Sequence, residues 1–153
     1  MKSVYQALES LIEITIEMSK KVEIGKDKIS YLKEHKTIRL CGPRRSGHTT
    51  SIGMATDHFS FDKIAVAIPT GGRRSNFMSR EWTVKNAHKV TMVNGVTSND
   101  FEKALRGRKF DAIFFDGASF FYTPFQIEVM YIMASYQAHD AQGNGLPLII
   151  FLQ

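Results

Sequence analysis

The 153-residue sequence has little of what marks secreted, disulfide-rich or membrane-spanning proteins. Its single cysteine excludes an internal disulfide and favours a reducing compartment, so we expect a cytoplasmic protein. The apolar stretch at residues 11–18 is interrupted by Glu13 and Glu17, so it predicts neither a secretory signal nor a membrane span. Acidic residues are in deficit, 15 against 20 Lys and Arg, which gives a net charge of +5. This balance favours an anionic partner but does not require a nucleic acid.

What the sequence does contain is an alternation of helix-like and strand-like segments. Short runs rich in β-branched and aromatic residues predict strands at residues 37–41, 63–68, 89–93, 111–115 and 148–152. Helices are expected at residues 3–20, 26–35, 47–58, 99–105 and 124–138. The alternation predicts an α/β fold: a three-layer core with a mainly parallel five-stranded sheet. Residues 1–35 would form a helical segment packed on a core of residues 36–153, in one compact domain.

Two smaller expectations accompany this fold. Residues 69–87 contain no predicted element, so we expect a long basic loop that is functional or mobile. Cys41 is the last residue of a predicted buried strand and is expected to be a small core residue.

The most informative segment, residues 42–49, reads G-P-R-R-S-G-H-T. It matches the phosphate-binding pattern G-x-x-x-x-G-K-S/T, except that His48 stands at the lysine position. A predicted strand precedes it and a predicted helix follows, an order that lets backbone N–H groups and a helix N-terminus face a polyphosphate. We therefore predict that a nucleotide is bound by Gly42, Arg44, Arg45, Ser46, Gly47, His48, Thr49 and Thr50.

A second motif is the apolar run at residues 111–116, which ends in the carboxylate of Asp116. An acid at the end of such a strand can hold Mg²⁺ or its water shell, and the Thr49 hydroxyl would supply another oxygen ligand. Taken alone, Asp116 is better explained as an acid that caps the turn after the strand. Its combination with the glycine loop favours a metal site formed by Thr49 and Asp116.

These motifs resemble those of viral and phage large-terminase ATPases. Residues 115–121, F-D-G-A-S-F-F, are similar to their D-E-A-A/S-F-F/I element, and residues 43–49 are similar to P-R-R-x-G-K-T. The resemblance extends over roughly residues 36–153 to the additional-strand, RecA-like group of P-loop NTPases, which includes superfamily 1 and 2 helicases. It implies ATP or another NTP with Mg²⁺, catalytic roles for Asp116 and Arg44, and Gln153 as a polar coupling residue. It also implies a viral or phage protein, acting in the host cytoplasm or nucleus.

The departures from this family concern catalysis. His48 replaces the lysine that reaches the β- and γ-phosphates, and Gly117 replaces the glutamate that polarises the attacking water. Arg44 and Arg45 are candidate substitutes for the lysine, because guanidinium groups are permanently charged and fork-shaped. No replacement for the glutamate has the family's spacing, so we expect weak or absent NTP hydrolysis. We also expect an ATPase core alone, without a second RecA-like domain or a nuclease domain.

A rival interpretation rests on the basic segment 73–89. Its cations and aromatic residue could track a DNA or RNA backbone and stack on bases, through Arg73, Arg74, Arg80, Trp82 and Lys85. The simpler alternative is a solvated surface with Trp82 packed at the edge of the core. The sequence thus leaves two functions open. One is nucleotide binding with impaired hydrolysis, and the other is a catalytically dead module that binds nucleic acid, a partner protein or further copies of itself.

Overall fold

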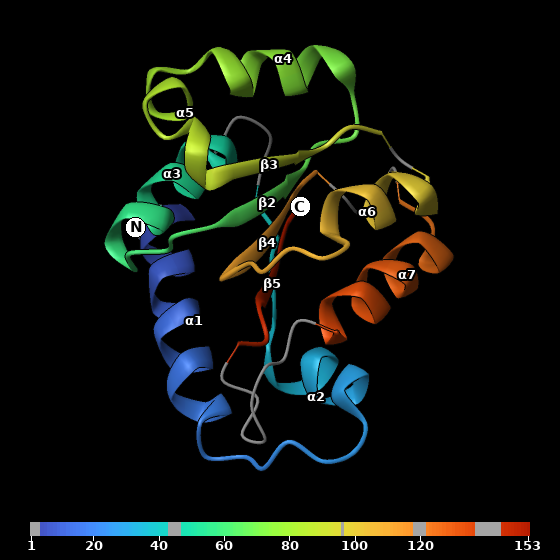
Figure 1. Cartoon of the computed structure of the whole chain (residues 1–153). Coiled ribbons are helices and arrows are strands. Elements are labelled where there is room, and N and C mark those ends of the chain that lie inside the picture. The colour runs from blue at the N-terminus through green and yellow to red at the C-terminus, as the bar shows by residue number, and fades with distance from the viewer. Residues whose placement is uncertain (1–3, 43–46, 96, 118–121, 137–144) are drawn as a thin grey trace.

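A central parallel sheet with helices on both faces forms the protein in the computed structural model (Figure 1). The structure describes residues 4–42, 47–95, 97–117, 122–136 and 145–153. All five strands run parallel, in the order β1-β5-β4-β2-β3. They are β1 (Thr37–Leu40), β2 (Ile64–Ala67), β3 (Val90–Val93), β4 (Ala112–Asp116) and β5 (Leu148–Leu152). The last strand in the chain therefore lies between the first strand and β4, and the carboxyl ends of all five meet at one edge.

The helices are divided between the two faces of the sheet. One face is covered by α1 (Val4–Ser19) and α3 (His48–His58), and the other by α2 (Lys28–His35), α6 (Ser98–Leu105) and α7 (Pro124–Ser135). The connection from β2 to β3 contains α4 (Gly71–Ser79), α5 (Glu81–Lys85) and the short 3-10 helix η1 (Ala87–Lys89). In Figure 1, α4 lies across the end of the sheet where the strands terminate.

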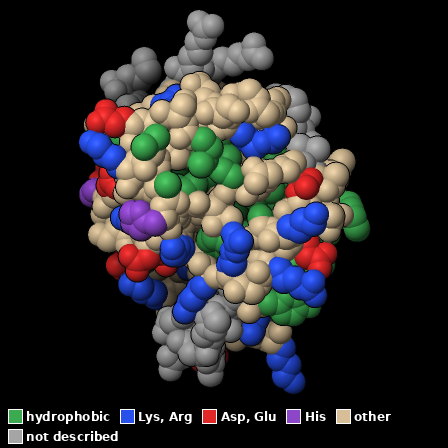
Figure 2. Space-filling model, turned by 45° about the horizontal axis from the view of Figure 1, so that its top comes forward, with side chains coloured by type: hydrophobic (Ala, Val, Ile, Leu, Met, Phe, Trp, Pro, Cys, Tyr) green, Lys and Arg blue, Asp and Glu red, His purple; other side chains and the backbone are tan. Residues whose placement is uncertain are grey.

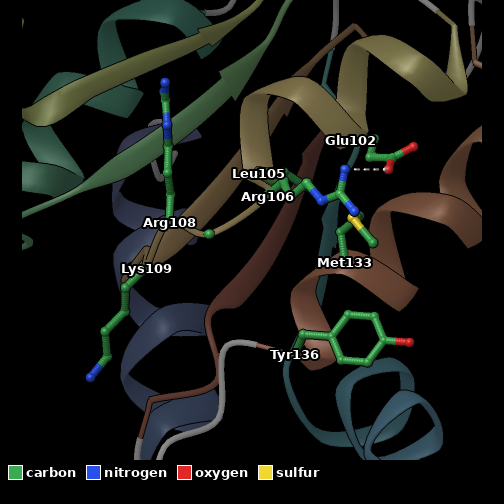
Figure 3. A pocket seen from close by; sticks show the side chains of 8 residues that line it. Glu102, Leu105, Arg106, Arg108, Lys109, Met133 and Tyr136 are labelled. Atoms are coloured by element: carbon green, nitrogen blue, oxygen red, sulfur yellow. Dashed lines mark ion pairs between the residues drawn. The ribbon is translucent and has the colours of Figure 1, made fainter.

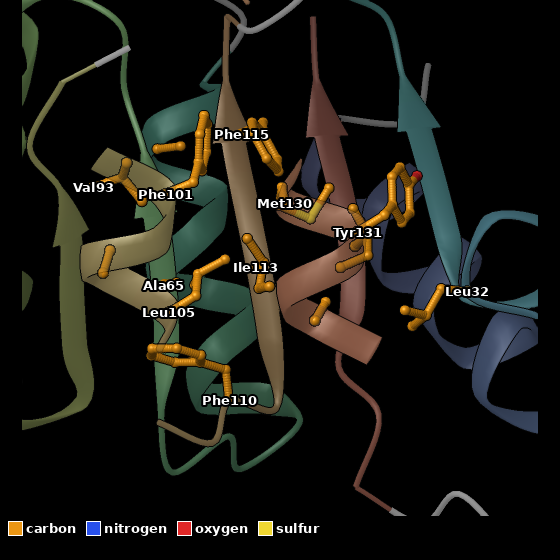
Figure 4. Packing of buried hydrophobic residues seen from close by; sticks show 14 of the residues in the cluster. Leu32, Ala65, Val93, Phe101, Leu105, Phe110, Ile113, Phe115, Met130 and Tyr131 are labelled. Atoms are coloured by element: carbon orange, nitrogen blue, oxygen red, sulfur yellow. The ribbon is translucent and has the colours of Figure 1, made fainter. Parts of the chain in front are cut away.

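The strand sequences explain the three layers. In β2, β4 and β5 every residue is buried, because successive side chains point to opposite faces and both faces are covered. Ile113, Phe115 and Phe151 pack with α6 and α7 (Figure 4), and Phe115 stacks on Phe151 with ring centroids 4.7 Å apart. Their neighbours Phe114 and Ile150 face α1 and α3.

The predicted fold class is confirmed, and most predicted elements lie within two residues of the observed ones. Thr123 caps α7 and Pro124 is its first residue, as expected, although residues 137–138 of the predicted helix lie outside the described residues. Among the described residues, no helix has the length and apolar character needed to cross a membrane.

Two expectations were wrong. Residues 69–87 are largely helical: the Thr70 side chain accepts from the Arg73 backbone N–H to cap α4, and Phe77, only 1% exposed, anchors that helix in the core. Cys41 is exposed at the edge of the sheet, because β1 ends one residue earlier, at Leu40.

Candidate functional site

The two predicted motifs meet at the carboxyl edge of the sheet. Gly47 adopts a left-handed conformation (φ +86°), and α3 begins directly after it, which places Thr49 in the first helical turn. Asp116 is the last residue of β4 and is 1% exposed. The Thr49 hydroxyl donates to Asp116 Oδ2 at 2.6 Å, across 67 residues of sequence. The predicted Thr49–Asp116 pair is therefore in direct contact.

Gln153 lies beside the start of the glycine loop. Its backbone N–H donates to the Leu40 carbonyl at 2.9 Å, and its carbonyl accepts from Gly42 N–H, also at 2.9 Å. Its side-chain oxygen accepts from the Cys41 thiol at 3.3 Å. The residue after β5 is thus tied to both residues that follow β1, because these strands are neighbours in the sheet.

Arg73 occupies a place that the sequence did not reveal. Its Nη2 lies 3.2 Å from Asp116 Oδ1, so a buried carboxylate is paired with a guanidinium whose side chain is 47% exposed. Gly117 follows with φ +78°, and a Cβ atom built on it would lie 2.6 Å from Arg73 Nη1. The space next to position 117 is therefore filled by the end of the Arg73 side chain.

The oxygen atoms of Thr49 and Asp116 are ligands of the kind that Mg²⁺ prefers, so this donor set fits the ion. The fit is modified by Arg73, which already supplies a positive charge to the other oxygen of Asp116. A metal held here would share that carboxylate with the guanidinium.

The remaining predicted phosphate-binding residues are only partly described. Arg44, Arg45 and Ser46 lie outside the described residues. His48 is the half-buried first residue of α3, and Thr50 is exposed and accepts from Arg80 Nη1 at 2.9 Å.

The predicted nucleic-acid-binding side chains have partners within the chain. Arg74 donates to the Ile68 carbonyl at 2.8 Å, and Lys85 pairs with Glu81 at 2.9 Å. The indole of Trp82 donates to Asp57 at 2.9 Å and packs against α3 at Gly53. Figure 2, which brings the α4 end of the molecule forward, shows Lys and Arg side chains separated by apolar and acidic ones. These contacts favour the packed-surface alternative for Trp82.

An aromatic cluster borders the site beneath the end of β4. Tyr122 lies edge-on to Phe115, with ring centroids 5.6 Å apart, and also contacts Phe101. Burial raises the pKa of Tyr122 to about 12. Its hydroxyl is buried without a hydrogen-bond partner among the described residues.

A cavity of about 400 Å³ lies at the opposite end of the sheet, between the ends of α6 and α7 (Figure 3). Its lining includes Met133, Tyr136 and the Arg106–Glu102 ion pair, whose nearest charged atoms are 3.4 Å apart. No predicted site residue lines this cavity, so it is separate from the contact between the two motifs.

The structure shows an α/β protein with a five-stranded parallel sheet and a polar cluster at the carboxyl edge of that sheet. Comparisons with protein-family models, curated proteins and solved structures found no match to this chain.

Proposed function

We propose that this chain is a P-loop NTPase-like domain that binds the phosphates of ATP or another nucleotide through residues 42–50, with weak or absent hydrolysis. The observation that carries the proposal is the 2.6 Å hydrogen bond from Thr49 to Asp116. It joins a glycine loop and a strand-terminal carboxylate that are far apart in sequence, in the arrangement that the phosphate and Mg²⁺ chemistry requires.

Three further features support phosphate binding at this edge. The left-handed Gly47 leads directly into α3, and the N-terminus of a helix attracts anions. β5 lies between β1, which leads into the glycine loop, and β4, which ends in Asp116. Gln153, at the end of that strand, lies next to Gly42, where a polar coupling residue would be placed.

Impaired hydrolysis follows from the residues around Asp116. Gly117 has no side chain with which to polarise water, and the neighbouring space holds a cation, Arg73, instead of a carboxylate. The loss of a positioned general base commonly costs a factor of about 10²–10⁴ in rate. Nucleotide binding without turnover at ordinary motor rates is therefore the expected behaviour.

Thermal unfolding with increasing Mg²⁺-ATP tests the binding. At a nucleotide concentration about 100 times the Kd, the stabilisation is about 2.7 kcal/mol, or about 5–10 °C for a chain of this size. Thr49→Val should abolish most of this shift. The matched control Thr91→Val makes the same change in β3, outside the cluster, and should preserve the shift. The absence of any shift in the wild type, with ATP and with GTP, would refute the proposal.

The same assay with DNA or RNA at two salt concentrations tests the rival function. Binding through α4 and α5 would produce a shift that weakens as salt increases. We expect little effect, because Arg74, Arg80 and Lys85 each have an intramolecular partner.

A further inference from the structure

The pairing of Arg73 with Asp116 has a consequence for the metal dependence of the site. Asp116 is buried, so its charge requires compensation from a nearby cation. In this structure one carboxylate oxygen accepts from the Thr49 hydroxyl and the other faces the Arg73 guanidinium. The carboxylate is thus compensated by a cation that belongs to the chain.

Backbone and side-chain hydrogen bonds in the first turn of α4 fix the position of Arg73. It lies in the first turn of α4, where its N–H donates to the capping Thr70 side chain at 3.4 Å. The next residue, Arg74, donates to the carbonyl of Ile68 and so ties the same turn to the end of β2. Because β2 is the direct neighbour of β4 in the sheet, this turn places Arg73 beside Asp116.

Gly117 makes room for the guanidinium. Any side chain at this position would begin 2.6 Å from Arg73 Nη1, too close for both to keep their positions. The left-handed backbone at Gly117 also disfavours other residues. Residue 117 and Arg73 therefore depend on each other: a glutamate there would displace the arginine from its place.

On the basis of the proposed function, we infer that Arg73 is a built-in substitute for the divalent cation, so that this site binds nucleotide polyphosphate without requiring Mg²⁺. A guanidinium carries five N–H donors in a fork that suits carboxylate and phosphate oxygens. With almost half of the side chain exposed, Arg73 can contact Asp116 and still offer donors to a phosphate at the same edge. A divalent ion at Asp116 would have to compete with the guanidinium for the carboxylate.

The test measures ATP binding by calorimetry with the folded full chain, in EDTA and in excess MgCl₂. For the wild type we expect Kd values that differ by less than about threefold between the two conditions. Arg73→Met should weaken ATP binding about tenfold in EDTA, and MgCl₂ should restore most of the lost affinity. A tenfold change lies within the usual range of coupling between two sites. The control Arg106→Met removes an equal charge at the opposite end of the sheet and should match the wild type.

A second readout needs no nucleotide. Free Mn²⁺, followed by electron paramagnetic resonance, should bind Arg73→Met about tenfold more tightly than the wild type, because the competing cation is gone. Wild-type ATP binding that is lost in EDTA would overturn this inference while leaving the proposed function in place. Failure to bind ATP in either condition would overturn both. The wild-type comparison alone decides the question if Arg73→Met does not fold.

Discussion

The contribution of the Thr49–Asp116 hydrogen bond to the free energy of unfolding can be measured without any ligand. Thr49→Val keeps the β-branched shape and a similar helix propensity while removing the hydroxyl that donates to Asp116. Hydrogen bonds to charged groups contribute about 1.5–3 kcal/mol. Since Thr49 is only half-buried, the lower part of that range applies, and we expect a loss of about 1.5–2 kcal/mol. Urea unfolding should show this loss as a lower midpoint at an unchanged slope.

The double-mutant cycle with Asp116→Asn assigns this loss to the contact. The amide oxygen of the Asp116→Asn variant can still accept from Thr49, but without charge, and a neutral bond contributes about 0.5–1.5 kcal/mol. Thr49→Val should therefore cost about 1 kcal/mol less in the Asp116→Asn background than in the wild type. If the two substitutions were additive within about 0.3–0.5 kcal/mol, Thr49 and Asp116 would not interact as the structure describes.

Three further predictions concern packing, pH and surface charge. Gly53→Ala should destabilise by about 1–2 kcal/mol and shift the fluorescence of the single tryptophan, because the new Cβ would lie 2.9 Å from the ring of Trp82; a more stable variant would contradict this packing. Burial raises the pKa of Tyr122 from 10 to about 12, because the folded protein favours the neutral phenol. The stability that this preference contributes is complete below pH 10, and it falls by at most about 2.7 kcal/mol as the pH rises to 12. Tyr122→Phe should remove this alkaline loss in pH-dependent urea unfolding, and parallel curves for the two proteins would refute it. Lys33→Ala, which breaks the exposed ion pair with Glu128, should change the free energy of unfolding by less than about 1 kcal/mol by the same assay, and a larger loss would show that this pair is not merely a surface contact.

The sequence predicted those elements whose local signals agree with their tertiary surroundings. The run Leu148–Leu152 is apolar throughout, as a strand covered on both faces must be, and it was predicted at its observed bounds. Thr123 and Pro124 are start signals that act within the helix itself, so the beginning of α7 was also predictable.

The segment after β2 was missed because its helix depends on distant contacts. Gly71 and Gly72 open α4 with poor helix formers. The helix is stabilised instead by the burial of Phe77 and by the Thr70 cap. Local propensity alone therefore predicts a loop, because the Thr70 cap is the one local signal for the helix and the burial of Phe77 depends on the packed sheet.

The sequence predicted the Thr49–Asp116 pair of the candidate site but not its third residue, Arg73. Thr49 and Asp116 belong to motifs whose positions in a parallel sheet are known in advance to converge. Arg73 reaches Asp116 because β2 adjoins β4, and strand order is not written in the local sequence. The one available signal was Gly117: the absence of a side chain next to Asp116 leaves space that some other group must fill.

The two departures from the terminase pattern then differ in kind. On the proposed function, His48 stands where the pattern has a lysine and would change the strength of a phosphate contact. At position 117 the pattern has a glutamate, and this chain has a glycine next to the buried Asp116. The space beside Gly117 is occupied by the guanidinium of Arg73, whose charge is opposite to that of a glutamate. Restoring a glutamate at position 117 would therefore not by itself restore a general base, because the new side chain could not enter this position without displacing the Arg73 guanidinium. On the proposed function, regaining hydrolysis would require changing Arg73 and Gly117 together.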